Sequence, residues 1–394
     1  MPSSSASSSS KTVVVVGFGP AAVPAVQTLA AQLPADYRLV VITATEGYWP
    51  PSSLRAAVVP TWETKPVAAA EGAFLQTKNR FLLQGTQVVE LWEHSVIIDK
   101  PHAELGSEIA FDYCILATGS KYAYPCRPRI GATVAQATAD LRQTQQEVAA
   151  AQSILIVGGG PVGVELAGEI GEYYAGKSGR PKKRVTLVHS HDKFLHEAGW
   201  SDKFNRGLKT QVEALGTRVI LSAKVVDAPD RSGPVAGGPR TFHLDNGETV
   251  EADFVFVAFG STPNTGFVGE FDPQALNEKK QVKVRPSFQV EGHDHLFAIG
   301  DITSVPETKL VAHAKNHGAV AAANVLAFIR ASANGTSAST KSYKPGPQIM
   351  LVCVGSKGGS GQLFGWTVGS WFTSFVKSKS LFVSDFKKLY GASA

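Results

Sequence analysis

The stretch Lys11-Thr-Val-Val-Val-Val-Gly17-Phe-Gly19-Pro-Ala-Ala22 decides how the chain begins to fold. The run of valines favours a buried β-strand, and the pattern G-x-G-x-x-A follows it directly. A helical pattern then continues to about Leu33, and Arg38–Thr43 has the composition of a second strand. In such a unit, glycines form the tight turn and let the backbone approach a pyrophosphate at the helix N-terminus. The stretch therefore predicts a dinucleotide-binding βαβ unit.

The same arrangement occurs a second time, in the middle of the chain. Ser153–Val157 is strand-like, Gly158-Gly-Gly160-Pro-Val-Gly163 forms the glycine-rich turn, and a helical pattern follows. After a loop over 176–183, Arg184–Val188 is strand-like again. One such match also fits a glycine-rich turn that binds nothing, but two matches in this order indicate two dinucleotide sites.

Three later strand-like segments end in residues suited to the edge of such a site. Phe111–Gly119 ends in Ala-Thr-Gly, and Asp253–Gly260 is its counterpart in the second half. Leu296–Asp301 ends in Gly-Asp, and a helix is expected from about 308 to 330. Small residues at these strand ends leave space for a cofactor that bulky side chains would block.

Composition and charge exclude several classes of protein. The chain has 394 residues, of which 43% are hydrophobic and 18% charged, so a largely disordered chain is excluded and two to three domains are expected. The formal net charge of +5 suits anionic ligands or lipid headgroups but is too small to indicate nucleic-acid binding. The basic run Arg180–Arg184 is the one local feature that favours nucleic acid, and clustered charge is usually solvated.

The three cysteines, Cys114, Cys126 and Cys353, form no CxxC or CxxxxC pair. Neither a dithiol relay nor a zinc site built from paired cysteines is therefore possible, and no metal site is predicted. The low and odd number of cysteines fits a reducing compartment, and all three are interpreted as packing residues.

Targeting signals are mostly absent. Residues 1–10 are rich in serine and are expected to be disordered. Pro2 stands where the Met-Gly start of a myristoylated protein has glycine. No segment has the pattern of a membrane span of about 20 apolar residues. The expected location is cytoplasmic, with a peripheral position on a membrane such as the mitochondrial outer face or a lipid droplet as a variant of it.

The order of these motifs resembles that of the flavoprotein oxidoreductases with two dinucleotide-binding domains. In that family the first fingerprint and the Gly-Asp segment hold FAD, and the inserted second fingerprint holds NADH or NADPH. The resemblance extends from Lys11 to about Tyr390. Within the family, the chain looks like the apoptosis-inducing-factor-like branch, which includes ferroptosis suppressor protein. The segments that suggest this branch are 54–56, 185–190, 289–293, 343–346 and 381–384.

The resemblance implies an α/β fold with two Rossmann-like domains. The FAD-binding domain would be discontinuous, over 11–125 and 285–345, and the NAD(P)H-binding domain would be inserted over 150–265. A small C-terminal unit, 346–394, would make a membrane, dimer or quinone contact. The loop 230–240 would connect antiparallel strands at the surface.

The resemblance also implies roles for individual residues. Asp301 would hydrogen-bond the FAD ribityl and phosphate region, and Arg55 would lie near the FAD. Glu165 would approach the nicotinamide, or would be an ordinary first-turn acid that complements the helix dipole. The positive charge of Lys309 would stabilise reduced flavin. Glu165 and Lys309 are the implied catalytic residues, and the implied cofactor-binding residues are Gly17, Gly19, Pro20, Ala21, Ala22, Thr43, Arg55, Val89, Ala117, Thr118, Gly119, Gly158, Gly160, Gly163, His189, Gly260, Gly300, Asp301 and Lys309.

Two departures from the family pattern concern the ends of the second strands. The first unit should end in an acid that binds the adenosine ribose, but Thr43 stands there, and its hydroxyl makes fewer hydrogen bonds than a carboxylate. Either FAD is held less tightly or Glu46 reaches back. In the second unit His189 replaces the acid that favours NADH, with His191 and Lys193 close by. NADPH is therefore predicted to be accepted along with NADH, unless these are surface residues and the preference is weak.

These features predict an FAD enzyme that takes a hydride from NADH or NADPH and passes electrons to a quinone of the ubiquinone type. Because CxxxxC is missing, disulfide reductases are excluded and electrons must leave the flavin directly. Two alternatives stay open. One is a reductase of a ferredoxin-like protein, monodehydroascorbate or oxygen, and the other is a cell-death or nucleic-acid-binding factor that uses the flavin fold as a scaffold. A monomer or a homodimer is expected.

The C-terminal segment bears on the acceptor. Trp371, Phe375, Phe382, Phe386 and Leu389 recur at helical spacing, with lysines among them. Such a stripe suits a helix on a membrane surface, but it more often belongs to a buried core or a dimer interface. By resemblance, this unit would help to form a quinone tunnel and a peripheral membrane contact through residues 363–390.

Overall fold

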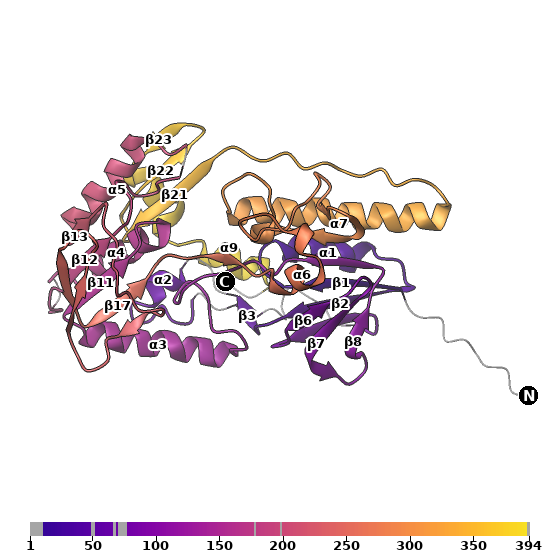
Figure 1. Ribbon diagram of the computed structural model, residues 1–394, viewed down its shortest axis with the longest axis horizontal. Coiled ribbons are helices and arrows are strands. Elements are labelled where there is room, and N and C mark those ends of the chain that lie inside the picture. Colours follow the sequence, from indigo (N-terminus) through magenta and orange to yellow (C-terminus); the bar gives the residue numbers. More distant parts are fainter. Residues whose placement is uncertain are drawn as a thin grey trace, which may run out of the picture.

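The computed structural model describes residues 11–48, 52–65, 68–69, 77–176, 179–197 and 199–391, with the backbone alone for 68–69. Residues 1–10, which the sequence predicts to be disordered, lie outside this description. Figure 1 shows two domains side by side, each built on a sheet, and a C-terminal unit that reaches both of them.

The first domain is built on a six-stranded sheet with the strand order β19-β20-β9-β1-β2-β5. The strands from β20 to β5 are parallel, and β19 is antiparallel at the edge. Residues 12–16 of β1 are all buried, as expected for a central parallel strand covered on both faces. The strands are β1 (Lys11–Val16), β2 (Tyr37–Thr43), β5 (Arg80–Gln84), β9 (Tyr113–Leu116), β19 (Gln289–Val290) and β20 (His293–Ala298).

Different layers cover the two faces of this sheet (Figure 1). Helices α1 (Ala22–Gln32) and α7 (Val311–Asn334) pack together on one face. Gly318 of α7 allows their close approach, because an added Cβ would lie 2.0 Å from the carbonyl oxygen of Ala21. The other face carries an antiparallel sheet and α6, namely β6 (Val88–Leu91), β7 (Ser95–His102), β8 (Gly106–Ala110) and α6 (Gly266–Phe271).

The second domain repeats the plan with a five-stranded sheet of order β13-β12-β11-β17-β14. Helices α4 (Pro161–Tyr173) and α5 (Asp202–Ala214) cover one face, and the hairpin β15 (Arg240–His243) and β16 (Thr249–Ala252) covers the other. The loop predicted over 230–240 contains the short antiparallel edge strand β14. The strands are β11 (Ser153–Val157), β12 (Arg184–Val188), β13 (Thr217–Ile220), β14 (Gly233–Pro234) and β17 (Phe254–Val257).

Two paired crossings insert the second domain into the first. The strands β10 (Ser120–Lys121) and β18 (Thr262–Pro263) are antiparallel neighbours. Beside them, the Thr118 hydroxyl donates to the carbonyl of Asn264 at 2.7 Å, and the Asn264 amide donates back to the carbonyl of Thr118 at 3.0 Å. Helix α3 (Val134–Ala150) follows the first crossing. The segment 266–284, which falls in neither expected domain, adds Val268, Ala275 and Val282 to the core of the first domain.

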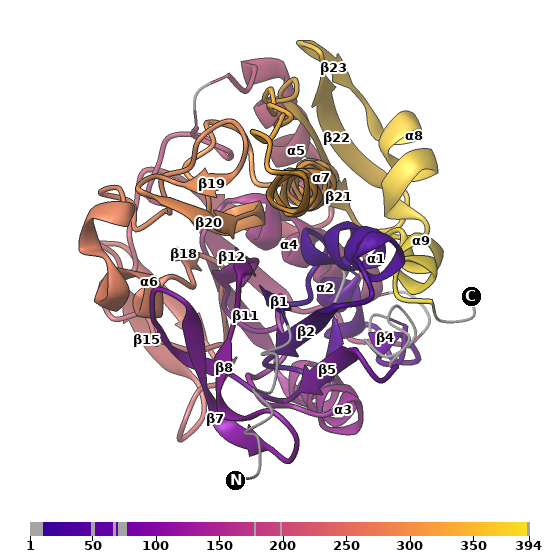
Figure 2. The same cartoon turned by 90° about the vertical axis from the view of Figure 1, so that its right-hand side faces the viewer.

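The C-terminal unit begins on the second domain and ends on the first. Its antiparallel strands β21 (Ile349–Val354), β22 (Gly358–Leu363) and β23 (Trp366–Val368) pack on α4 and α5. Helix α8 (Ser370–Thr373), a π-helical turn (Ser374–Ser378) and α9 (Val383–Leu389) then return the chain to α1 (Figure 2). There the Tyr390 hydroxyl donates to the carbonyl of Phe18 at 2.9 Å, so the unit ties the domains together.

The expected α/β class, with two Rossmann-like domains and a small C-terminal unit, is confirmed. The remaining short elements, β3 (Gly47–Tyr48), β4 (Ala68–Ala69) and α2 (Ser53–Ala56), lie in the connection after β2. Within the described ranges, no helix combines the length and apolar character needed to cross a membrane.

Candidate active site

A cavity of about 3620 Å³ lies where strand ends of both domains face the C-terminal unit. In open parallel sheets, ligands bind beyond the carboxyl ends of the strands. Pockets for one small ligand usually measure about 300–1,000 Å³, so this cavity has room for more than one extended ligand. Residues of both glycine-rich turns line it, together with Met350, Leu351 and Phe372 of the C-terminal unit.

The first glycine turn is tight against the sheet and open toward the cavity. Gly17 has φ +98°, and a Cβ on it would lie 2.3 Å from the carbonyl oxygen of Ala117. Its N–H donates to the carbonyl of Ile42 at 2.7 Å, which fixes the turn on β2. Around Gly19 the nearest such atom is 3.9 Å away on Tyr48, and beside Gly119 there is none within 4 Å. This cradle fits the pyrophosphate of a dinucleotide, held by backbone N–H groups at the start of α1.

The second glycine turn has the same construction. Gly158 has φ +116°, and its Cβ would lie 2.6 Å from the carbonyl oxygen of Ala258. A Cβ on Gly163 would lie 1.9 Å from the carbonyl oxygen of Gly158, so these two glycines shape the turn and are not themselves cavity-lining. Gly160, with no atom within 4 Å of its Cβ position, does line the cavity at the start of α4.

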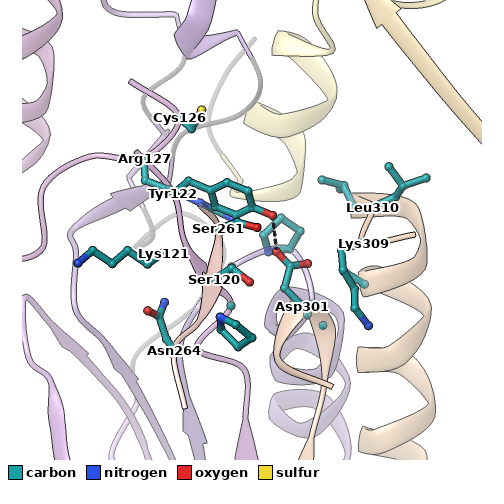
Figure 3. Close-up of a pocket in the computed structure, with 18 of the residues that line it drawn as sticks. Ser120, Lys121, Tyr122, Cys126, Arg127, Ser261, Asn264, Asp301, Lys309 and Leu310 are labelled. Carbon is teal, nitrogen blue, oxygen red and sulfur yellow. Dashed lines mark hydrogen bonds between the residues drawn. The ribbon is translucent and has the colours of Figure 1, made fainter. Parts of the chain in front are cut away.

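Asp301 lies in the cavity wall, in the helical turn Gly300–Ile302 that follows β20. Figure 3 shows its carboxylate pointing toward Tyr122, whose hydroxyl donates to Oδ2 at 3.3 Å. The guanidinium of Arg127 lies over the Tyr122 ring at 5.6 Å and over the Tyr48 ring at 5.1 Å. Burial and the negative charge of Asp301 raise the pKa of the Tyr122 hydroxyl, which stays protonated as a donor.

The segment just before α7 places the side chain of Lys309 in the cavity wall. Its ammonium donates to the carbonyls of Thr303 at 2.8 Å and Val305 at 3.0 Å. Burial lowers its pKa, and the carboxylates of Glu307 and Asp301 oppose this effect. The ammonium is therefore held in place by the backbone at the end of the cavity that Asp301 marks.

Glu165 of α4 lines the cavity and is paired with the C-terminal unit. Its carboxylate accepts the Lys377 ammonium at 2.6 Å and the Cys353 backbone N–H at 3.1 Å. The ammonium also donates to the carbonyl of Leu351 at 2.8 Å. Burial by itself lowers the pKa of Lys377, but the ion pair outweighs burial and the net shift is upward. Lys377 is one of the lysines found among the C-terminal aromatic residues in the sequence, and the structure makes it part of the cavity wall.

Arg55 is placed below the cavity and not in its lining. Its guanidinium makes a bidentate ion pair with Glu169, with both N–O distances at 2.8 Å, and the two side chains are 4% and 3% exposed. The guanidinium also lies 4.8 Å from the centre of the Trp62 ring. The pair joins α2 to α4, so in this structure Arg55 links the two domains.

The first departure from the family pattern lies in the cavity wall at the end of β2. Thr43 lines the cavity, and its hydroxyl donates to the carbonyl of Thr45 at 3.2 Å. Glu46 does not point back toward it, because its carboxylate accepts the Val134 N–H at the start of α3, at 3.2 Å. A carboxylate for the ribose is therefore not supplied by Glu46 in this conformation.

The second departure, His189, is buried under the second glycine turn. Its Nδ1 accepts the Gly159 N–H at 3.0 Å, and its Nε2 is buried without a hydrogen-bond partner. Burial, and then the neighbouring His191 and His196, lower its pKa to about 4, so the ring is neutral at pH 7. The exposed imidazoles are those of His191 and His196, which stack with centroids 3.5 Å apart.

The cavity thus brings together most of the residues that the sequence singled out. Ala22, Arg55, Gly158, Gly163, His189 and Gly260 are not in its lining. Those that line it are Gly17, Gly19, Pro20, Ala21, Thr43, Val89, Ala117, Thr118, Gly119, Gly160, Glu165, Gly300, Asp301 and Lys309.

Sequence reasoning missed three side chains that organise the site. Arg127 lies on the first crossing, outside any motif, and Lys377 is on the far C-terminal unit. His317, on α7, accepts the Gly300 N–H on Nδ1 at 3.1 Å, while its Nε2 is 2.6 Å from Glu307. It thereby fixes the turn that carries Asp301. In the sequence, only the distance of His317 from the Gly300-Asp301 pair could have pointed to this role. That distance can be interpreted only when the fold shows that α7 packs against the turn Gly300–Ile302.

The cysteines cannot act as a thiolate relay. Cys114 and Cys353 are buried and Cys126 is half-buried, and all three are free thiols. Burial raises the pKa of Cys126 to about 12 and that of Cys353 to about 12. Electrons therefore have no dithiol route away from a bound flavin.

Comparison with known protein families explains the two turns and the insertion together. The family model of the pyridine nucleotide-disulphide oxidoreductases matches residues 11–318. The chain belongs to this family. It is an NAD(P)H-dependent flavin oxidoreductase, and its cofactors are FAD and NADH or NADPH. The chain lacks the cysteine pair that a disulphide reductase needs for its reaction.

Several curated proteins are similar along most of their length. Ferroptosis suppressor protein 1 of Xenopus tropicalis is 32% identical over 82% of this chain and 83% of its own. Apoptosis-inducing factor homolog A of Dictyostelium discoideum is 28% identical over 96% of this chain and 91% of its own. FAD-dependent oxidoreductase FVFD30 of Flammulina velutipes is 30% identical over 73% of this chain and 84% of its own. The expected apoptosis-inducing-factor-like branch is confirmed.

Solved structures agree on the fold. The water-forming NADH oxidase from Lactobacillus brevis, bound to NADH, aligns with a TM-score of 0.66 at 17% identity, over 89% of this chain and 75% of its own. Reduced CoADR-RHD of Bacillus anthracis aligns with a TM-score of 0.65 at 19% identity, over 89% of this chain and 61% of its own.

Proposed function

We propose that this protein is an NAD(P)H:quinone oxidoreductase. The observation that carries the proposal is the apolar wall that the C-terminal unit adds to the cavity. Met350, Leu351, Phe372, Val376 and Phe386 all line it. An apolar wall beside a flavin site suits a hydrophobic acceptor with a ring and a tail, and the likeness to ferroptosis suppressor protein 1 agrees with this choice.

The bound cofactors supply the redox chemistry, with FAD as the carrier between nicotinamide and acceptor. The chain's own residues bind and orient. The backbone N–H groups of the two turns hold pyrophosphates, and Asp301 with Tyr122 offers hydrogen bonds at the end of β20. The ammonium of Lys309 places a positive charge there, where negative charge on a reduced ring system is stabilised.

A pair of phenylalanines tests the acceptor. Phe372 lines the cavity, whereas Phe375, one helical turn further, is 78% exposed. We expect Phe372→Ala to raise the KM for a short-chain ubiquinone roughly tenfold, since an apolar contact to a ligand is worth about 1–3 kcal/mol. The rate with ferricyanide as acceptor should be unchanged, and Phe375→Ala should match the wild type with both acceptors. Equal behaviour of all three proteins with the quinone would contradict the proposal.

The proposed enzyme works at a membrane surface. Phe364, Trp366, Trp371 and Phe375 are 72–81% exposed and belong to adjacent elements of the C-terminal unit. Exposed Lys357 and Lys379 lie near them in the sequence, and their positive charge suits anionic headgroups. Phe386 and Leu389 are not part of this surface, because they pack against the first domain. Residues 363–375 therefore form the proposed contact.

Vesicle binding tests this location. Trp371→Ala/Phe375→Ala should reduce co-sedimentation with vesicles of phosphatidylcholine and phosphatidylserine severalfold, whereas Phe372→Ala should sediment like the wild type. The opposite ranking of the two variants, or no sedimentation of the wild type, would contradict a peripheral cytoplasmic membrane location through this surface.

Acceptance of NADPH as well as NADH is also proposed. No acidic side chain follows β12 directly, since His189 and Ser190 stand there, and a 2′-phosphate would meet no repelling carboxylate from these positions. The kcat/KM values for NADH and NADPH should lie within about tenfold of each other. At positions 189 and 190 there is no carboxylate that would bind the ribose hydroxyls of NADH with two hydrogen bonds or repel the 2′-phosphate of NADPH. A preference for NADH on the order of a hundredfold would contradict this.

A further inference from the structure

A second cluster of polar side chains lies on the first domain, away from the cavity. Glu93 and His94 form the turn between β6 and β7, and His295 lies on β20. One ligand atom from each of the three side chains lies within 4.8 Å of the other two. None of them lines the cavity. Two imidazoles and a carboxylate are a donor set for a first-row transition metal such as Zn²⁺.

His293 extends the cluster, two residues before His295 on the same strand. Its Nδ1 is buried without a hydrogen-bond partner and lies 3.5 Å from Oε2 of Glu93. Its Nε2 is 3.1 Å from Oδ2 of Asp272, at the end of α6. A carboxylate on one ring nitrogen fixes the tautomer and leaves the other nitrogen with its lone pair, as for histidines that bind metal.

The distances from two of the histidines to Glu93 are close to those between neighbouring ligands of one ion. Metal–ligand bonds of about 2.0–2.2 Å place neighbouring ligand atoms roughly 3.3–3.6 Å apart. His293 Nδ1 and His295 Nε2 lie 3.5 Å and 3.7 Å from the two oxygens of Glu93. The His94 and His295 rings stack with centroids 4.3 Å apart, and one ligand atom of His94 lies within 4.8 Å of those of Glu93 and His295.

A hydrogen bond bears on the tautomer of His295. Its Nε2 lies 2.5 Å from the carbonyl oxygen of Glu93, so ligation there replaces this hydrogen bond and requires the tautomer that carries the ring proton on Nδ1. The backbone carbonyl and the side chain of Glu93 thus both lie close to Nε2 of His295.

We propose that a divalent transition metal ion such as Zn²⁺ binds at a structural site formed by Glu93, His94, His293 and His295. The ion would connect the β6–β7 turn to β20. These elements end at the cavity, because Val88 and Val89 of β6 line it and β20 runs into Gly300 and Asp301. Metal binding therefore stabilises the edge of the sheet that holds the flavin nucleotide, without taking part in electron transfer.

Calorimetric titration of the purified flavin-loaded enzyme with Zn²⁺, after treatment with a chelator and dialysis, tests the site. We expect one equivalent to bind and the melting temperature to rise. Glu93→Gln and His295→Ala should each weaken binding at least tenfold, since loss even of a residue that only hydrogen-bonds to a metal ligand typically costs about 10–100-fold in affinity. Glu93 is the safer variant, because its side chain is 58% exposed and its loss cannot disturb the core.

A matched control uses the exposed, stacked pair His191 and His196 of the second domain. His191→Ala/His196→Ala should bind Zn²⁺ like the wild type. Equal affinity in the Glu93 and His295 variants, or loss of binding in this control, would overturn the proposal and mean that only scattered surface histidines hold the ion. Flavin absorbance serves as the check on folding, and quinone reductase activity plays no part in the readout.

Discussion

At the scale of single residues, the ion pair between Glu165 and Lys377 is the feature that decides how the cavity is closed. Both side chains are largely buried, at 7% and 14% exposure, and they come from different units of the chain. Removal of one partner leaves the other charge desolvated and unpaired. The family resemblance gives Glu165 a place near the nicotinamide, and the pair gives it a structural role as well.

Glu165→Gln separates these roles. The amide keeps the shape but loses the charge, so we expect the free energy of unfolding to fall by about 1–3 kcal/mol. The second substitution Lys377→Met should restore part of that loss, because no unpaired ammonium then remains. Urea denaturation of the wild type, both single variants and the double variant measures the coupling.

Stopped-flow reduction by NADH gives the second readout for the same four proteins. Slow reduction in Glu165→Gln at unchanged stability would assign the carboxylate to the nicotinamide and would contradict a structural role. Reduced stability with a normal reduction rate would assign it to the pair alone.

The buried histidines predict a pH dependence of stability. Burial lowers the pKa of His189 and that of His317 from 6.5 to about 4. Between these values the unfolded chain binds more protons than the folded one, so stability falls as the pH is lowered from about 6.5 toward 4. Melting temperatures of His189→Asn and His317→Asn should depend less on pH in this window than those of the wild type. The same substitution at exposed His191 is the control, and an equal slope in all proteins would refute the assignment.

The sequence could predict residues whose role depends on local geometry, and it missed those whose role depends on contacts across the chain. Gly17 and Gly160 follow from the turn itself, and the structure places both in the cavity wall. Other residues of the site have partners that are distant in sequence, so no local motif predicts their roles; these are Arg127, Lys377 and the cluster around His295. The sequence predicted no metal site because its cysteines form no pair with the spacing of metal ligands.

At the scale of elements, the contact between α4 and β21 leaves no room for a side chain at Gly168. A Cβ on Gly168 would lie 2.6 Å from both Val354 Cα and Gly355 N, which are backbone atoms and cannot rotate away. We expect Gly168→Ala to cost about 1–3 kcal/mol of stability and to loosen the C-terminal unit. Limited proteolysis should then release fragments cut between 340 and 394.

Gly207 in α5 provides the matched control for this substitution. Its nearest neighbour, Ser360 Oγ, would be 3.4 Å from an added Cβ, so the alanine has room. Gly207→Ala should be neutral or should stabilise by about 0.5–1 kcal/mol, because alanine is the better helix former. Equal stability of the two variants would show that α4 and β21 are not packed as described.

Most elements could be predicted from the sequence because each has a pattern of its own. Ser153–Val157 and Arg184–Val188 agree with β11 and β12 to the residue. The expected helix from about 308 begins only at Val311. The aromatic stripe of the C-terminal segment was harder, since α8, a π-helical turn and α9 replace one continuous helix. Its residues therefore divide between the cavity, the first domain and the surface.

At the scale of the whole molecule, the C-terminal unit is what makes one cavity from two dinucleotide domains. It begins on α4 and α5 and ends with Tyr390 hydrogen-bonded to Phe18, while Tyr48 stacks on Tyr390 at 5.4 Å. The order of the two dinucleotide sites followed from the two glycine turns, and the insertion of the second domain followed from the family resemblance. The closing of the cavity did not, because it depends on contacts of the C-terminal unit that have no local signature.

The most direct test of the quinone reductase assignment is anaerobic stopped-flow absorbance of the flavin band. The enzyme is mixed first with NADH or NADPH and then with a short-chain ubiquinone. We expect rapid bleaching with either nucleotide, rapid recovery with quinone, and slow recovery in Phe372→Ala. A flavin that is reduced rapidly but is not reoxidised by quinone faster than by residual oxygen would contradict the assignment.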